Sequence, residues 1–149
     1  MKARNQVSYH FNSGQTALLK GGKAYAPRGA PTPVIRAIAA ANRLQSMPYK
    51  WGGGHARPYD NGYDCSGSVS YVLREAGLLD TPLQSRDYFN YGRVGEGDWI
   101  TVYTRKGHAF MTVAGLRLDT AGPGGNTGPR WRAQNREAKG YVLRHPDGF

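Results

Sequence analysis

The spacing of the apolar residues changes once along this chain, and that change constrains the fold more than any other feature. Before residue 77 the apolar residues recur every three or four positions in two segments, whereas from residue 99 they fall into short runs of β-forming residues separated by glycines. The first pattern is typical of amphipathic helices and the second of antiparallel strands. Helices followed by a run of strands predict an α+β fold.

Two helices are expected in the first half of the chain. Thr32 is a suitable N-cap for the first, with a proline at the first helical position, and this helix should stop before Pro48. The second begins at Cys65, with Asp64 as its N-cap, and ends at Gly77. Cys65 is therefore expected in the first turn of a helix.

The second half is expected to form a meander of strands. A short helical segment from Ser85 to Asn90 precedes them, and we expect a glycine-rich loop from Gly122 to Gly128. The strands are predicted over residues 99–104, 109–114, 116–120 and 141–144.

The length of 149 residues is that of one domain, so we expect a single domain over 1–149. Residues 1–30 are polar and rich in glycine with weak periodicity, which predicts an extended N-terminal arm before a core over 31–149. No stretch approaches the roughly 18 apolar residues of a membrane span, and the basic start leads into no run of signal-peptide length. Either an export signal has been removed or the protein leaves its cell by another route.

The chain is strongly basic, with 20 Lys and Arg against 10 Asp and Glu and a formal net charge of +10. Such a surface attracts polyanions. The basic residues are scattered and match no helix-turn-helix, zinc-finger or RNA-binding signature, so nucleic acid is not the expected partner. Anionic lipid headgroups and the anionic bacterial envelope stay open.

The single cysteine, Cys65, cannot form a disulfide within the chain. In the first turn of a helix its thiol faces unpaired N–H groups and the positive end of the helix dipole, which favour the nucleophilic thiolate. Buried structural cysteines are common, however. Cys65 by itself leaves both interpretations open.

Two further residues lie where they could assist a nucleophile. His108 begins a predicted strand 43 positions after Cys65 (108 minus 65), the cysteine-first order of papain-like enzymes. Asp119 follows on the next strand, and a turn near Ala114 and Gly115 would bring it beside His108, where it could hold the imidazole tautomer. A lone histidine is more often structural, and Asp119 is equally suited to a turn contact.

Two other interpretations concern the same region. A zinc site of Cys65 and histidines lacks the usual ligand spacing, so we expect neither a metal nor an organic cofactor. His55 follows three glycines and fits either the lining of a cleft or a polar loop.

Three short motifs together resemble the NlpC-type family of cell-wall cysteine peptidases. They are Pro48-Tyr49-Lys50-Trp51-Gly52-Gly53, Asp64-Cys65-Ser66-Gly67 and Gly107-His108, and they occur in the family's order over about residues 33 to 120. The resemblance implies a papain-like α+β fold. It also implies cleavage of the γ-D-glutamyl to diamino acid bond of peptidoglycan stem peptides, by a cysteine, a histidine and a third polar residue.

By this resemblance Cys65 is the nucleophile, His108 the base and Tyr49 the tyrosine that lines the site. The third family position is often a histidine, whereas Asp119 stands here, one residue earlier than a common spacing. The expected reaction proceeds through a thioester, with the oxyanion held by the Cys65 N–H and the Tyr49 hydroxyl. The expected partner is peptidoglycan, in the periplasm or outside the cell.

Several alternatives remain at this stage. The same fold serves amidases and acyltransferases that act on other amides, and a catalytically silent wall-binding module would also suit the positive charge. A domain without an export signal also fits a phage lysin or an antibacterial toxin, which would bring a holin or an immunity protein as partner.

Overall fold

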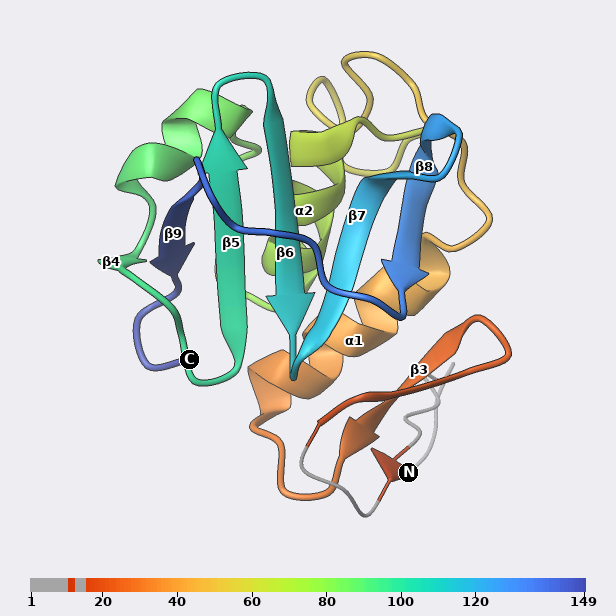
Figure 1. Ribbon diagram of the computed structural model, residues 1–149, viewed down its shortest axis with the longest axis vertical. Helices are drawn as coiled ribbons and strands as arrows, with labels where there is room; N and C mark the ends of the chain where they lie inside the picture. Colours follow the sequence, from red (N-terminus) through yellow and green to blue (C-terminus); the bar gives the residue numbers. More distant parts are fainter. Residues whose placement is uncertain (1–10, 13–15) are drawn as a thin grey trace.

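The computed structural model describes residues 11–12 and 16–149, and Figure 1 shows its helices on one face of a large sheet. A smaller sheet lies beside helix α1. The elements are β1 (Phe11–Asn12), β2 (Leu18–Lys20), β3 (Lys23–Pro27), α1 (Thr32–Arg43), α2 (Cys65–Glu75), the 3-10 helix η1 (Ser85–Asn90), β4 (Arg93–Val94), β5 (Ile100–Arg105), β6 (His108–Val113), β7 (Leu116–Gly122), β8 (Gly125–Arg132) and β9 (Val142–His145).

The large sheet has the strand order β4-β9-β5-β6-β7-β8, and all its neighbouring strands are antiparallel. The four predicted strands are confirmed as β5, β6, β7 and β9, and the short helical segment is confirmed as η1. The predicted α+β layout is therefore present, with α2 packed against β6 and β7.

Strand β8 was missed, because its first half falls in the segment predicted as a glycine-rich loop. It pairs with β7 from Arg117 opposite Arg132 to Gly122 opposite Gly125. Trp131 is buried in the core and its indole N–H donates to Asn42 on α1 at 2.8 Å. These are contacts with distant parts of the chain, which outweigh a weak local strand propensity.

The turn between β6 and β7 is as predicted and sets the register of both strands. Val113 pairs with Leu116, so Ala114 and Gly115 form a two-residue turn, and both have positive φ, 48° and 82°. Two positive φ angles are the mark of the type I′ hairpin turn, whose twist matches that of the strands. This turn carries β7 back alongside β6.

The two predicted helices are both present, with one difference at a cap. Thr32 was the predicted N-cap of α1, but the N-cap is Pro31 and Thr32 is the first helical residue. The backbone of Pro31 is extended (φ −61°, ψ 152°), so the helical conformation begins one residue later, at Thr32. The helix ends at Arg43, ahead of Pro48 as expected. Its buried face packs against β3 and α2. No helix in the described part of the chain is long and apolar enough to cross a membrane.

An extended arm was predicted over residues 1–30, but the described residues of this segment form strands. Strand β3 lies between β1 and β2, and Ala24 and Ala26 are buried in the core cluster. Asn42 of α1 accepts from the Ala24 N–H at 2.9 Å and donates to its carbonyl at 3.0 Å. These bonds and the burial of alternate alanines hold the strand on the helix. Residues 1–10 and 13–15 of the predicted arm lie outside the described residues.

Candidate active site

Cys65 is the first residue of α2, as the sequence predicts, and it is half-buried. The Asp64 side chain caps the helix by accepting from the Gly67 N–H at 2.7 Å, and the first intrahelical bond runs from the Ser68 N–H to the Asp64 carbonyl at 2.9 Å. The N–H groups of Cys65 and Ser66 precede that bond and mark the positive end of the helix. The thiol therefore lies where a negative charge is stabilised.

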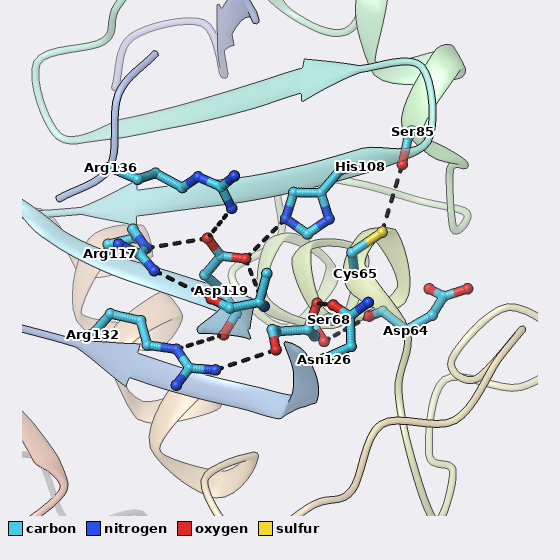
Figure 2. Close-up of polar contacts among 12 residues, drawn as sticks. Asp64, Cys65, Ser68, Ser85, His108, Arg117, Asp119, Asn126, Arg132 and Arg136 are labelled. Atoms are coloured by element: carbon cyan, nitrogen blue, oxygen red, sulfur yellow. Dashed lines mark hydrogen bonds and ion pairs between the residues drawn. The ribbon is translucent and has the colours of Figure 1, made fainter. Parts of the chain in front are cut away.

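His108 and Asp119 lie together beside this thiol. Figure 2 shows the imidazole between Cys65 and Asp119, with its Nε2 atom 2.9 Å from Asp119 Oδ1. The remaining ring nitrogen, Nδ1, is left to face the sulfur. The geometry thus brings together the three residues that the sequence singled out, in the order thiol, imidazole and carboxylate.

The pairing of thiol and imidazole shifts both pKa values. Burial acts to raise the pKa of Cys65, but hydrogen bonds from His108 and from the Ala109 N–H more than offset it, so the pKa is lowered. Burial acts to lower the pKa of His108, yet its bonds to Asp119 and Cys65 raise the pKa to about 9. Both shifts favour the charged pair, a thiolate beside an imidazolium, over the neutral one.

Asp119 is held as an anion by its surroundings. Its side chain has no exposed surface, and burial acts to raise its pKa, but the bonds from His108 and from the Ala121 N–H (2.9 Å) outweigh burial and lower it. The ladder between β7 and β8 shifts register between Asp119 and Ala121. Such irregularities re-aim side chains, and this one lets the carboxylate bond the N–H two residues ahead.

A cleft of about 570 Å³ opens in front of the thiol. Tyr49 lines it, and the pKa of this tyrosine is raised by burial and by the nearby charges of Cys65 and Asp64. The residues that line the cleft are Tyr49, Trp51, Gly52, His55, Asp64, Cys65, Ser66, Gln84, Ser85, Arg86, Lys106 and Gly107.

His55 satisfies both of the interpretations that the sequence left open. It lines the cleft, and its Nε2 atom lies 2.9 Å from Asp64 Oδ1 and 3.1 Å from Ser66 Oγ. The bond to Asp64 raises the pKa of the imidazole, although burial acts against this. His55 therefore supports the residue that caps α2.

Sequence reasoning missed three side chains of this region. Ser85 Oγ lies 3.7 Å from Cys65 Sγ, and the Ser85 carbonyl accepts from the Thr104 hydroxyl on β5. Arg117 and Arg136 lie on the far side of Asp119 (Figure 2). No local motif signals Ser85 or Arg136, because each reaches the site from a distant segment. Arg117 lies two residues before Asp119 on β7, where strand alternation places both side chains on one face.

The shifted thiol pKa gives a direct test. Because the pKa of Cys65 is lowered, the native protein holds a larger thiolate fraction near neutral pH than an ordinary thiol does. Alkylation of the native protein by iodoacetamide is therefore expected to be fast near pH 7, with a second step near pH 9, where His108 loses its proton. The rate measured against pH, with denatured protein as reference, checks this.

His108→Ala should move the alkylation profile of Cys65 to higher pH, since it removes the imidazolium partner. If native Cys65 instead titrates at or above the denatured value, or reacts only after unfolding, the thiol is structural.

Known proteins match this chain in structure and not in sequence. No family model matches the sequence, and no curated protein matches it. Solved structures do match. The P60 domain of an antigen from M. avium subspecies paratuberculosis is 23% identical with a TM-score of 0.54, over 77% of this chain and 96% of that domain.

Two further structures agree with the first. The peptidoglycan hydrolase RipB from Mycobacterium tuberculosis is 22% identical with a TM-score of 0.56, over 80% of this chain and 73% of RipB. An NlpC/P60 family protein from Bacillus cereus is 16% identical with a TM-score of 0.56, and the 83% of this chain that matches spans 44% of that protein. The predicted papain-like α+β fold is confirmed.

Proposed function

We propose, from the premise that this chain has the NlpC/P60 fold, that it is a cell-wall hydrolase and a cysteine endopeptidase acting on peptidoglycan stem peptides. The observation that carries the proposal is the row of Cys65, His108 and Asp119 at the edge of an open cleft. A structural cysteine needs neither an imidazole partner nor a cleft in front of it. The whole chain, 1–149, is proposed to act as one catalytic domain.

The proposed reaction is acyl transfer. The Cys65 thiolate attacks the carbonyl carbon of the scissile amide, and His108 donates its proton to the leaving amine as the C–N bond breaks. Neutral His108 then takes a proton from water, which attacks the thioester and releases the acid and the free thiolate. Asp119 keeps the Nε2 proton in place throughout, so that Nδ1 is the atom that exchanges protons.

The negative charge that develops on the carbonyl oxygen needs donors. The Cys65 N–H stands at the start of α2, ahead of the first intrahelical bond, and the helix dipole adds to its effect as a donor. Tyr49 lines the same cleft, and its raised pKa keeps the hydroxyl protonated and able to donate. We therefore assign both groups to the oxyanion.

The bond cleaved is proposed to be the one between the γ-D-glutamyl residue and the diamino acid, as the resemblance implies. Digestion of purified peptidoglycan followed by mass spectrometry of the soluble fragments tests this, because each bond leaves fragments of different mass. Fragments that end in a free γ-D-glutamyl carboxylate are expected.

Release of an intact stem peptide from the sugar would instead identify an amidase, and ligated products an acyltransferase. Pelleting with walls without any release would identify a wall-binding module. Cys65→Ala protein treated in the same way is the control, since it keeps the surface and removes the thiol.

A further inference from the structure

The carboxylate of Asp119 is shared between two groups of partners, one on each oxygen. Oδ1 faces His108 and the Ala121 N–H, whereas Oδ2 lies 3.1 Å from Arg136 Nη1 and 3.1 Å from Arg117 Nε. Figure 2 shows Asp119 enclosed between the imidazole and the two guanidinium groups. Two arginines on a carboxylate that already holds a histidine are more than charge neutralisation requires.

The two arginines are not equivalent. Arg117 is engaged elsewhere, because its Nη1 donates to the Gln134 carbonyl at 2.6 Å and its Nη2 to the Ala121 carbonyl at 3.2 Å. Its Nε, although close to Asp119, forms no hydrogen bond with any described residue. Arg136 Nη1 does donate to Oδ2. Arg136 therefore controls the orientation of this oxygen.

Arg136 is itself held by aromatic rings. Its guanidinium lies 5.2 Å from the Phe110 ring centre and 5.5 Å from that of Tyr141, and these two rings pack edge to face. The segment that carries it, between β8 and β9, crosses the face of the sheet opposite the helices (Figure 1). The Arg136 side chain is 31% exposed and that of Asp119 0%, so the arginine covers the carboxylate on the solvent side.

Sharing the carboxylate affects how firmly His108 holds its proton. The two arginines and the imidazolium all lie against the carboxylate of Asp119, and like charges this close together repel appreciably inside a protein. Several charged and titratable groups surround His108. Cys65 faces it from α2 and Asp119 from β7, with Arg117 and Arg136 behind the carboxylate and Arg132 on the Asp119 carbonyl. The others are Tyr141, whose ring centre lies 6.5 Å from that of His108, and Arg105 and Lys106 at the preceding turn.

We propose that Arg136 is a positioning residue of the active site. It holds Asp119 with Oδ1 toward the imidazole, and its charge keeps the imidazolium acidic enough to protonate the leaving amine. The effect on protonation of the leaving amine rests on the proposed function. The effect on the orientation of Asp119 concerns only the arrangement of Cys65, His108 and Asp119.

Arg136→Gln tests both effects, since it removes the charge and keeps a side-chain donor. The rate constant kcat for peptidoglycan cleavage is expected to fall on the order of tenfold, with KM little changed, because Arg136 does not line the cleft. The alkaline limb of the pH profile, where the imidazolium loses its proton, should move up by about half a pH unit or more. The upper step of the Cys65 alkylation profile should move with it.

Two matched variants accompany the test. Arg136→Lys keeps the charge and is expected to restore the alkaline limb while recovering only part of kcat, since lysine lacks the planar fork. Lys139→Gln removes the same charge from the same segment, at an exposed side chain with no contact to Asp119 among the described residues, and should behave as wild type.

The proposal for Arg136 and the proposed function fail on different results. The proposal is overturned if Arg136→Gln changes neither kcat nor the alkaline limb of the pH profile. It is also overturned if activity falls only in proportion to the loss of folded protein and the alkaline limb stays in place. If the wild-type protein cleaves no peptidoglycan, the proposed function fails, and the alkylation profile still decides whether Arg136 acts on His108.

Discussion

Cys65→Ala and His108→Ala are each expected to abolish peptidoglycan cleavage and to leave the fold intact. In the proposed reaction the sulfur forms the bond to the substrate, and the imidazole both stabilises the thiolate and protonates the leaving amine. When residues act as one catalytic unit, removing one of them lowers the activity about as much as removing all of them. Each variant should therefore lose on the order of 10³-fold or more in kcat. The measurement is release of soluble fragments from purified walls, beside circular dichroism of each variant.

Asp119→Ala is expected to lose less activity, because in the proposed reaction Asp119 orients the imidazole and forms no bond to the substrate. His145→Ala is the matched control. His145 on β9 bonds the Gly95 carbonyl at 2.9 Å and does not line the cleft, so its loss should leave cleavage unchanged. Full activity in either purified Cys65→Ala or His108→Ala would refute the peptidase assignment, and wild-type activity in Asp119→Ala would place the third residue elsewhere.

Gly67→Ala is expected to destabilise the protein, although alanine normally stabilises a helix relative to glycine by about 0.5 to 1 kcal/mol. Gly67 lies in the first turn of α2, and a methyl group there would overlap the carbonyl oxygen of Gly53. That carbonyl also accepts from the Asp64 N–H at 3.3 Å. The loop that carries Trp51 and Gly52 into the cleft would have to move off the helix.

Overpacking of this kind costs about 1 to 3 kcal/mol, and more where the neighbour is backbone. For a chain of this size we expect the melting temperature to fall by roughly 4 to 10 °C. Cleavage should fall further than the folded fraction does, because the displaced loop lines the site. Thermal unfolding followed by circular dichroism measures this melting temperature. A value equal to or above that of the wild type would contradict the prediction and show that the loop can move at little cost in free energy.

The close approach of Gly53 and Gly67 also explains two of the motifs. Gly53, in the run of three glycines after Trp51, and Gly67, two residues after Cys65, are the points at which a loop and a helix end meet. A resemblance between short motifs therefore reflects one contact in the folded chain, and this contact is what places Tyr49 and Cys65 in one cleft.

The sequence by itself determined the parts of this protein that depend on neighbours within a few residues. The cap at Asp64, the apolar spacing that follows it and the stop at Gly77 place Cys65 at a helix start, and the two-residue turn at 114–115 returns β7 along β6. These signals act over one helical turn or one hairpin, so a short stretch of sequence is enough to predict them.

Only the tertiary structure decided what surrounds these residues. Strand β8 exists because β7 pairs with it and Trp131 enters the core, and Ser85 meets the thiol from 20 positions away. Arg136 reaches Asp119 from a segment that crosses the sheet, 17 positions along the chain. Such contacts depend on which distant segments pack together, and no short stretch of sequence carries that information, because burial and pairing are properties of the whole fold.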